Sequence, residues 1–196
     1  MLRVRTLGAA LISALAVLAA GCGSPADQDQ GQDQSQSQAP ASAAPPAAPG
    51  SSTNAAAPVN VPEELKFTAK TLDGTDFSGE SLAGRSTVLW FWTPWCARCQ
   101  GESANMARFA KEHAANVAFV GVAAQDQVSA MQEFVTKGGV QGFAHLNDKD
   151  SAIWKRFGII EQPSYAFIHP DGTVEVSKRQ LSENEMAGRL RILSEA

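Results

Sequence analysis

The segment STVLWFWT, residues 86–93, constrains the fold most strongly because it is apolar on both of its faces. That pattern is typical of a strand at the centre of a sheet that helices cover on both sides. Residues 96–113 follow almost at once and show helical spacing, with Met106, Phe109 and Ala110 along one face. The two segments therefore predict a central strand that leads directly into a helix.

Further strand and helix patterns flank this pair. Apolar alternation around Asp73-Gly74 predicts a hairpin near the start of the globular part. Later patterns predict a buried strand at 116–124, a helix at 128–139 and a short helix at 150–158. We therefore expect helices and strands to alternate through the middle of the chain.

The end of the chain predicts a second hairpin and a closing helix. The segments SYAFIH and TVEVSK are joined by a Pro-Asp-Gly turn, and Ser182 with Glu185 forms a capping box for the helix that follows. The whole order predicts an α/β fold. We expect a mixed central β-sheet flanked by helices, an N-terminal β-hairpin and an additional helix-bearing insertion before the last hairpin.

The first residues carry the pattern of an export signal. Arg3 and Arg5 precede an apolar run at 7–20, which is too short to cross a bilayer comfortably, and small residues follow. The segment LAAGC resembles a bacterial lipobox, although Ala19 stands where leucine is commonest. This resemblance predicts a lipoprotein signal peptide at 1–21 and a lipid on Cys22. Ordinary cleavage that leaves Cys22 as a free thiol is the alternative.

Composition divides the remaining chain into a tether and a single domain. Residues 22–60 begin at Cys22 and are rich in Gln, Ala, Pro and Ser, with no aromatic side chain, so we expect a disordered tether. Residues 61–196 hold enough large apolar residues for one core. The formal net charge of −4 argues against nucleic acid as a partner. We expect a monomer on the extracytoplasmic face of the cell membrane, held there by its lipid.

Two of the three cysteines, Cys96 and Cys99, lie where the central strand meets the helix. Amide hydrogens at a helix start are unpaired and the helix dipole is positive there, which stabilises a thiolate on Cys96. Its pKa should therefore fall below the ordinary value of about 8.5. Cys99, one turn later on the same face, is within reach of a disulfide. The spacing predicts that one sulfur attacks and the other resolves.

Three alternative roles for the cysteine pair fit the sequence less well. Zinc requires four ligands, and His113, His145 and His169 are scattered along the chain. A peroxiredoxin-like thiol is suggested by Thr93, but the proline which that family places four residues earlier would fall at Leu89. A purely structural disulfide stabilises little when its loop is so short. The residues thus favour a redox-active pair without a metal or other cofactor.

The segments VLWFWTPWCARC and EQPSYAFIHPDGTV together resemble the thioredoxin superfamily, in its TlpA, ResA and DsbE branch. The similarity is greatest to the DsbE- and DsbF-like thiol–disulfide oxidoreductases of mycobacteria and other actinobacteria. The resemblance implies a thioredoxin-like domain at 61–196 and a redox disulfide between Cys96 and Cys99. It also implies a cis-proline at Pro163, which frees the backbone of Gln162 to pair with a substrate strand.

Three further residues near the pair, Arg98, Glu102 and Trp95, are candidates for tuning or substrate binding, and Trp90 marks a departure from many thioredoxins. Trp90 stands where many thioredoxins carry a buried aspartate. Glu102 falls where TlpA- and ResA-like proteins have a glutamate; it either tunes Cys99 or is simply solvated on the first helix. Arg98 replaces a proline, and its charge should stabilise the neighbouring thiolate. Trp95 is expected on an apolar rim that receives unfolded substrate.

The sequence predicts an extracytoplasmic, membrane-anchored thiol–disulfide oxidoreductase that makes disulfides in exported proteins. The alternatives are a reductase of apocytochrome c or other exported disulfides, a peroxiredoxin-like peroxidase with antioxidant activity, and a non-catalytic surface lipoprotein. The expected partners are unfolded or partly folded exported proteins and a membrane protein that resets the disulfide, similar to VKOR, DsbB or DsbD.

Overall fold

The structure is a computed structural model, and it describes residues 60–196. The predicted signal peptide at 1–21, the lipid on Cys22 and the tether up to residue 59 lie outside the described residues. Within residues 60–196, no helix has both the length and the apolar character that are needed to cross a membrane.

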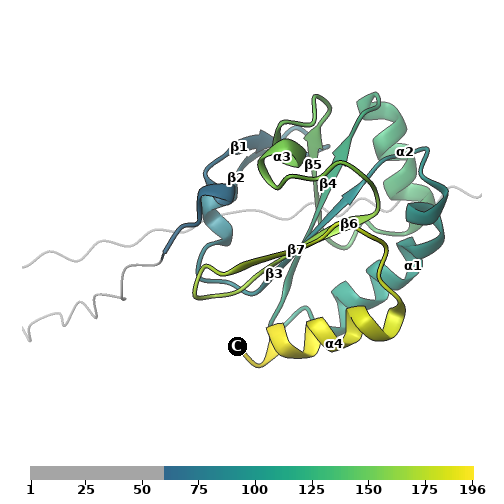
Figure 1. Cartoon of the computed structure of the whole chain (residues 1–196). Helices are drawn as coiled ribbons and strands as arrows, with labels where there is room; N and C mark the ends of the chain where they lie inside the picture. Colours follow the sequence, from purple (N-terminus) through teal and green to yellow (C-terminus); the bar gives the residue numbers. More distant parts are fainter. Residues whose placement is uncertain (1–59) are drawn as a thin grey trace, which may run out of the picture. The chain divides into compact units, whose positions relative to one another are not determined.

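Five strands form a mixed sheet in the order β5-β4-β3-β6-β7 (Figure 1). The strands are β3 (Thr87–Trp92), β4 (Ala118–Ala124), β5 (Ala144–Asp148), β6 (Ser164–Ile168) and β7 (Val174–Ser177). Strands β3, β4 and β5 run parallel, whereas β6 and β7 join by antiparallel pairing. Every residue of β3 is buried, as its apolar sequence predicted for a central strand.

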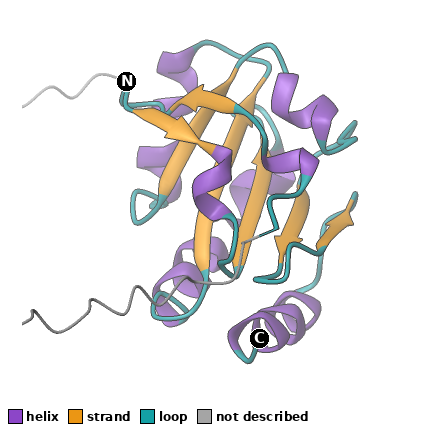
Figure 2. Cartoon of the chain, turned by 90° about the vertical axis from the view of Figure 1, so that its left-hand side faces the viewer, coloured by secondary structure: helices purple, strands orange, loops and turns teal. Residues whose placement is uncertain are grey.

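Helices cover both faces of the sheet (Figures 1 and 2). One face packs against α1 (Ala97–Glu112), α2 (Val128–Gly138) and α4 (Glu183–Ser194). The crossovers β3-α1-β4 and β4-α2-β5 each connect to the next strand in the same direction across the sheet. Because such connections are usually right-handed, α1 and α2 lie on the same face of the sheet. The other face packs against α3 (Ala152–Arg156) and two 3₁₀ helices, η1 (Glu63–Leu65) and η2 (Gly79–Leu82).

The N-terminal hairpin forms a separate two-stranded sheet. Its strands are β1 (Thr68–Lys70) and β2 (Asp76–Ser78), which pair antiparallel. Gly74 in the connecting turn has φ +89°, a conformation that favours glycine. The predicted α/β fold, with its mixed sheet, flanking helices and N-terminal hairpin, is confirmed.

Strand β5 was not predicted from the sequence, because its residues AHLND do not show an apolar pattern. His145 and Asp148 are nevertheless buried, since each has partners inside the fold. The ring of His145 is bonded through Nε2 to the carbonyl of Val140 at 2.8 Å. The amide of Leu72, beyond β1, donates to the carbonyl of His145 at 2.8 Å and so covers the outer edge of the strand. The predicted insertion therefore contains a strand as well as the short helix α3.

Candidate active site

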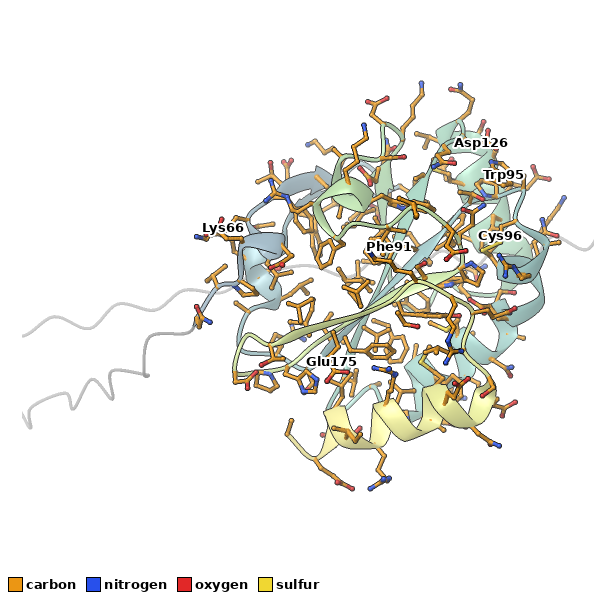
Figure 3. All side chains as sticks on the ribbon, in the orientation of Figure 1. Lys66, Phe91, Trp95, Cys96, Asp126 and Glu175 are labelled. Atoms are coloured by element: carbon orange, nitrogen blue, oxygen red, sulfur yellow. A yellow bond between two sulfur atoms is a disulfide. The ribbon has the colours of Figure 1, made fainter. Side chains whose placement is uncertain are left out.

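Cys96 and Cys99 are joined by a disulfide at the start of α1, with a Cα–Cα distance of 5.2 Å. Cys96 is the N-cap of this helix, and its Sγ accepts a hydrogen bond from the amide of Cys99 at 3.1 Å. Figure 3 shows Cys96 and Trp95 at the same end of the molecule as Asp126, which follows β4. The disulfide thus lies at the carboxyl end of the parallel strands.

The two cysteines differ in their access to solvent. Cys96 keeps 6% of its surface exposed and Cys99 keeps none. Cys96 is therefore the cysteine of the pair that an attacking thiolate can approach. When the disulfide opens, the amide that already points at Cys96 and the positive end of α1 are in position to stabilise a thiolate there.

A second loop closes over the helix start. The peptide bond between Gln162 and Pro163 is cis, and Pro163 is buried. Arg98, which lies between the two cysteines, donates from Nη2 to the carbonyl oxygen of Gln162 at 2.9 Å. The structure thus brings Arg98 and Gln162 together across 64 residues of sequence. The carbonyl of Gln162 therefore already accepts one hydrogen bond, from Arg98, and a carbonyl oxygen can accept a second one.

Glu102 is buried one turn beyond Cys99, so the solvated alternative is wrong. Trp90 Nε1 donates to Glu102 Oε1 at 2.7 Å. The Tyr165 hydroxyl lies 2.8 Å from Oε1 and 2.7 Å from Oε2, and Gln180 Nε2 donates to Oε2 at 3.0 Å. The carboxylate therefore has donors from β3, from β6 and from the loop before α4.

Burial raises the pKa of Glu102, while hydrogen bonds from Tyr165, Gln180 and Trp90, and then the charge of Arg98, act in the opposite direction. Burial is also the main reason that the pKa of Tyr165 is raised. Trp90 replaces the aspartate of many thioredoxins, but its indole holds a carboxylate that reaches the same region from α1. A buried carboxylate one turn from Cys99 on α1 can accept or return a proton.

The sequence did not identify Tyr165 and Gln180 as members of this network. One signal was available, because Tyr165 is the only tyrosine in the chain and follows Pro163 by two positions. Gln180 carried no such signal, since its side chain reaches Glu102 across 78 residues.

Two large apolar side chains are exposed in the segments that carry the cysteine pair and the proline. Trp95, predicted on the apolar rim, is 56% exposed, whereas Trp90 and Trp92 are fully buried. Ile160, which the sequence did not identify, is 86% exposed and lies three residues before Pro163. Trp95, next to Cys96 in the chain, gives the surface there an apolar character that suits an unfolded chain.

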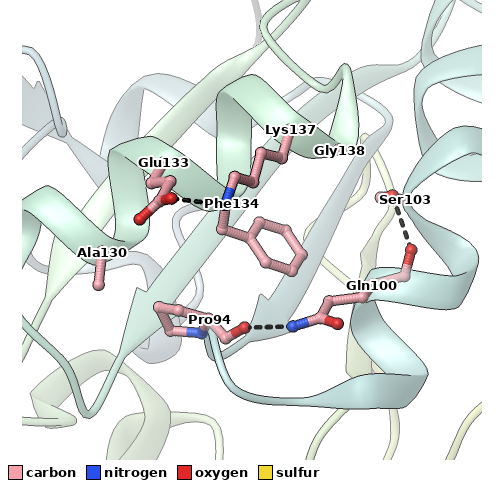
Figure 4. A pocket seen from close by; sticks show the side chains of 8 residues that line it. All are labelled: Pro94, Gln100, Ser103, Ala130, Glu133, Phe134, Lys137 and Gly138. Carbon is pink, nitrogen blue, oxygen red and sulfur yellow. Dashed lines mark hydrogen bonds and ion pairs between the residues drawn. The ribbon is translucent and has the colours of Figure 1, made fainter. Parts of the chain in front are cut away.

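A cavity of about 380 Å³ lies between the start of α1 and α2 (Figure 4). Gln100 Nε2 donates to the carbonyl of Pro94 at 2.8 Å along one wall. Glu133 and Lys137 form an ion pair at 2.5 Å along another. The lining combines apolar and polar groups from Pro94, Gln100, Ser103, Ala130, Glu133, Phe134, Lys137 and Gly138.

Residues 60–196 contain no group of three or more His, Cys, Asp or Glu side chains that is arranged to hold a metal ion. The histidines lie apart: His113 Nδ1 is 3.0 Å from Ser194 Oγ, and His169 is 3.5 Å from a carboxylate oxygen of Glu175. Thr93, considered for a peroxidatic site, is buried, and Leu89 lies within β3.

Residues 61–177 match the AhpC/TSA family, and this range includes the cysteine pair and the proline loop. The soluble secreted antigen MPT53 of Mycobacterium tuberculosis is 42% identical over 144 residues, which are 72% of this chain and 82% of that protein. The similarity therefore extends over most of both chains.

Two solved structures are also similar. The structure of MTB DsbF, in mixed oxidised and reduced forms, has 51% identity and a TM-score of 0.66, covering 68% of this chain and 99% of that chain. A secreted disulfide oxidoreductase from Mycobacterium tuberculosis, described as homologous to E. coli DsbE, has 42% identity and a TM-score of 0.63. It covers 67% of this chain and 98% of that chain.

Proposed function

The chain belongs to the AhpC/TSA family of thioredoxin-like proteins, and from this premise we propose that it forms disulfides in exported proteins. It is a thiol–disulfide oxidoreductase of the thioredoxin type, and the predicted resemblance to mycobacterial DsbE- and DsbF-like proteins is confirmed. The oxidising direction, the residue roles and the lipid anchor are the proposal.

One observation carries the proposal: Cys96 of the disulfide is the N-cap of α1 and keeps some exposed surface, whereas Cys99 keeps none. A substrate thiolate attacks Cys96 Sγ, the bond between the two protein sulfurs breaks, and Cys99 leaves as a thiolate that takes up a proton. A second substrate thiolate then attacks the substrate sulfur of the mixed disulfide and releases Cys96. Two electrons pass from the two substrate thiols to the protein, and the substrate gains a disulfide.

The proline loop presents the substrate. Gln162, which precedes Pro163, contacts Arg98 in the first turn of α1, and an extended substrate segment pairs with the backbone of Gln162 as an added strand. Trp95 supplies apolar surface beside Cys96. Glu102 serves as the proton acceptor and donor for Cys99, one turn away on α1.

Two features support the oxidising direction. Arg98 places a permanent positive charge between the cysteines, and this charge stabilises the Cys96 thiolate. A stabilised thiolate favours the reduced protein, which makes the disulfide a stronger oxidant. Trp90 removes the buried aspartate that many thioredoxins carry at this position.

The buried Glu102 also supports a second function, reduction of apocytochrome c or of other exported disulfides, as the resemblance to ResA-like proteins implies. Equilibration with glutathione distinguishes the two directions. A reduction potential of about −120 to −180 mV supports the oxidase, whereas a value below about −250 mV supports the reductase.

Refolding of a reduced protein with several disulfides tests the catalytic role directly. The full-length chain should accelerate refolding, whereas Cys96→Ser should not. Equal refolding rates with the wild type and with Cys96→Ser would contradict the catalytic role and favour a non-catalytic lipoprotein. Peroxide consumption, measured in parallel, should stay at the background rate; rapid consumption that depends on Cys96 would favour the peroxidase instead.

We further propose that residues 1–21 direct export and that a lipid on Cys22 holds residues 61–196 at the membrane through the tether. The lipobox-like segment supports the anchor, and a membrane protein of the VKOR, DsbB or DsbD kind would reset the disulfide. Labelling of expressing cells with a radioactive fatty acid should mark the wild type and not Cys22→Ala. Equal labelling would contradict the anchor.

A further inference from the structure

Arg98 is an exposed residue in the first turn of α1 that connects the two loops of the site. Its guanidinium reaches the carbonyl of Gln162 at 2.9 Å, next to the cis-proline. This hydrogen bond fixes the guanidinium between the start of α1 and the proline loop.

The charge of Arg98 has no carboxylate partner within 4.0 Å among residues 60–196. The nearby carboxylate of Glu102 is already bonded to three other side chains. A guanidinium has five N–H donors, and the bond to Gln162 uses one of them. The remaining donors match a carboxylate, which can accept two parallel hydrogen bonds.

A substrate strand that pairs with Gln162 approaches the carbonyl that Arg98 contacts, so its residues pass close to the guanidinium. A carbonyl oxygen has two lone pairs, so Arg98 can keep its bond to Gln162 when the strand binds. A neutral substrate segment leaves the remaining guanidinium donors to water. A segment with a carboxylate beside its cysteine accepts charge-assisted bonds from these donors, which are stronger than bonds to a neutral group.

We infer that Arg98 is a specificity-determining residue that favours exported cysteine segments with Asp or Glu beside the reacting cysteine. This inference rests on the proposed function, since it names the substrate class of the same site. Glu161 is exposed next to Gln162, and its negative charge reduces the attraction of Arg98 for a substrate carboxylate. Glu161 forms no ion pair with Arg98, so the guanidinium is not neutralised.

Single-turnover oxidation of short peptides tests the inference. Each peptide carries two cysteines, and Glu, Gln or Lys flanks the first cysteine on one side or the other. The oxidised full-length protein carries Cys22→Ser, so that only Cys96 and Cys99 contribute thiols. The rate constant for each peptide is divided by its rate constant with hydroxyethyl disulfide, which removes the effect of the flanking charge on the peptide thiol itself.

The wild type should oxidise the better Glu peptide about threefold to fivefold faster than the matched Gln peptide, and the Lys peptide should be slowest. One molar salt should reduce the ratio, because it screens exposed charges. Arg98→Ala should bring the ratio close to one and Arg98→Lys should retain part of it. Any effect of Arg98 on the redox potential acts on all peptides alike and cancels in the ratio.

Arg156 provides a matched control. It is also exposed, has no carboxylate within 4.0 Å among the described residues, and donates to the carbonyl of Glu63 at 2.9 Å, but it lies on α3. Arg156→Ala should leave the ratio unchanged. Equal rates for the Glu and Gln peptides with the wild type, or a preference that survives in Arg98→Ala, would overturn the inference. If no peptide is oxidised at all, the proposed function itself fails.

Discussion

Glu102 and Asp148 are both buried carboxylates, with 8% and 5% of their surfaces exposed, but they serve opposite faces of the sheet. Burial raises the pKa of each. Asp148, at the end of β5, accepts from the backbone amides of Ile153 and Trp154 at 3.0 and 2.9 Å. Its donors belong to the first turn of α3, so this carboxylate holds a helix in place.

Glu102 has different donors, which are the side chains of Trp90, Tyr165 and Gln180. None of them needs Glu102 to complete a helix or a strand. The carboxylate also lies one turn from Cys99, whereas Asp148 ends β5, which is two strands away from β3 in the sheet. Burial alone therefore does not identify a functional carboxylate; the source of its hydrogen bonds and its distance from reactive atoms do.

Asp148→Ala tests the structural side of this comparison and should have the largest effect. It leaves two amides of α3 without their acceptor, and we expect a loss of about 3 kcal/mol in the free energy of unfolding. Urea denaturation measures the loss. Asp148→Asn keeps one acceptor oxygen and should lose less. The reduction potential of the disulfide should stay unchanged in both, and a shift would place Asp148 in the chemistry after all.

His145 extends the comparison to a buried base. Burial lowers its pKa from 6.5 to about 4. Because the folded-state pKa is depressed, the stability that His145 contributes is present above pH 6.5 and is lost as the pH falls toward 4. The wild type should therefore lose about 2 to 3 kcal/mol relative to His145→Gln between pH 7 and pH 4.

Gln suits this test because its amide can still donate to the carbonyl of Val140, which the ring of His145 contacts at 2.8 Å. Urea denaturation at several pH values measures both proteins. Parallel curves for the two proteins would show that His145 titrates normally in the folded state.

Local patterns predicted most of the fold. The apolar residues of β3, the hairpin turn at Gly74 and the capping box of Ser182 and Glu185 all lie where the sequence placed them. Each of these depends on residues that are neighbours in the chain. Strand β5 was missed because its polar side chains are paired with backbone groups just outside the strand, and a search for apolar alternation does not detect such pairing.

The same reasoning explains what could be predicted of the site. The cysteine pair at the helix start is a local feature and was predicted. The contacts of Glu102 with Tyr165 and Gln180 span 63 and 78 residues, and that of Arg98 with Gln162 spans 64. Such contacts depend on the packing of β6 and the α4 loop against α1, which no local pattern specifies.

Glu102→Gln tests the functional side of the comparison. We expect the rate of peptide oxidation near pH 7 to fall about tenfold, because an amide cannot exchange a proton with Cys99. The pH dependence of that rate should lose the step that the carboxylate contributes. Asp148→Asn is the matched control and should keep the wild-type profile. Identical profiles for all three proteins would remove Glu102 from the proton transfer.

The two carboxylates should still resemble each other in stability. Each has a raised folded-state pKa, so the stability that it contributes is fully present below its unfolded pKa of about 4 and is lost as the pH rises through the folded value. Glu102→Gln and Asp148→Asn should both flatten this part of the stability curve. If the wild type instead gained stability relative to either variant as the pH rose through this range, the hydrogen bonds of that carboxylate would outweigh its burial.

Tyr165→Phe should have the smallest effect and separates the hydroxyl from the ring. Phe keeps the buried ring but removes the donor that contacts both oxygens of Glu102. Because that hydrogen bond opposes the effect of burial, its loss should raise the pKa of Glu102 further. The step in the rate profile should therefore move to higher pH, with a loss of about 1 kcal/mol in stability. In a Glu102→Gln background the same change should not move the profile, and a shift that persists there would mean that Tyr165 acts on Cys99 without the carboxylate.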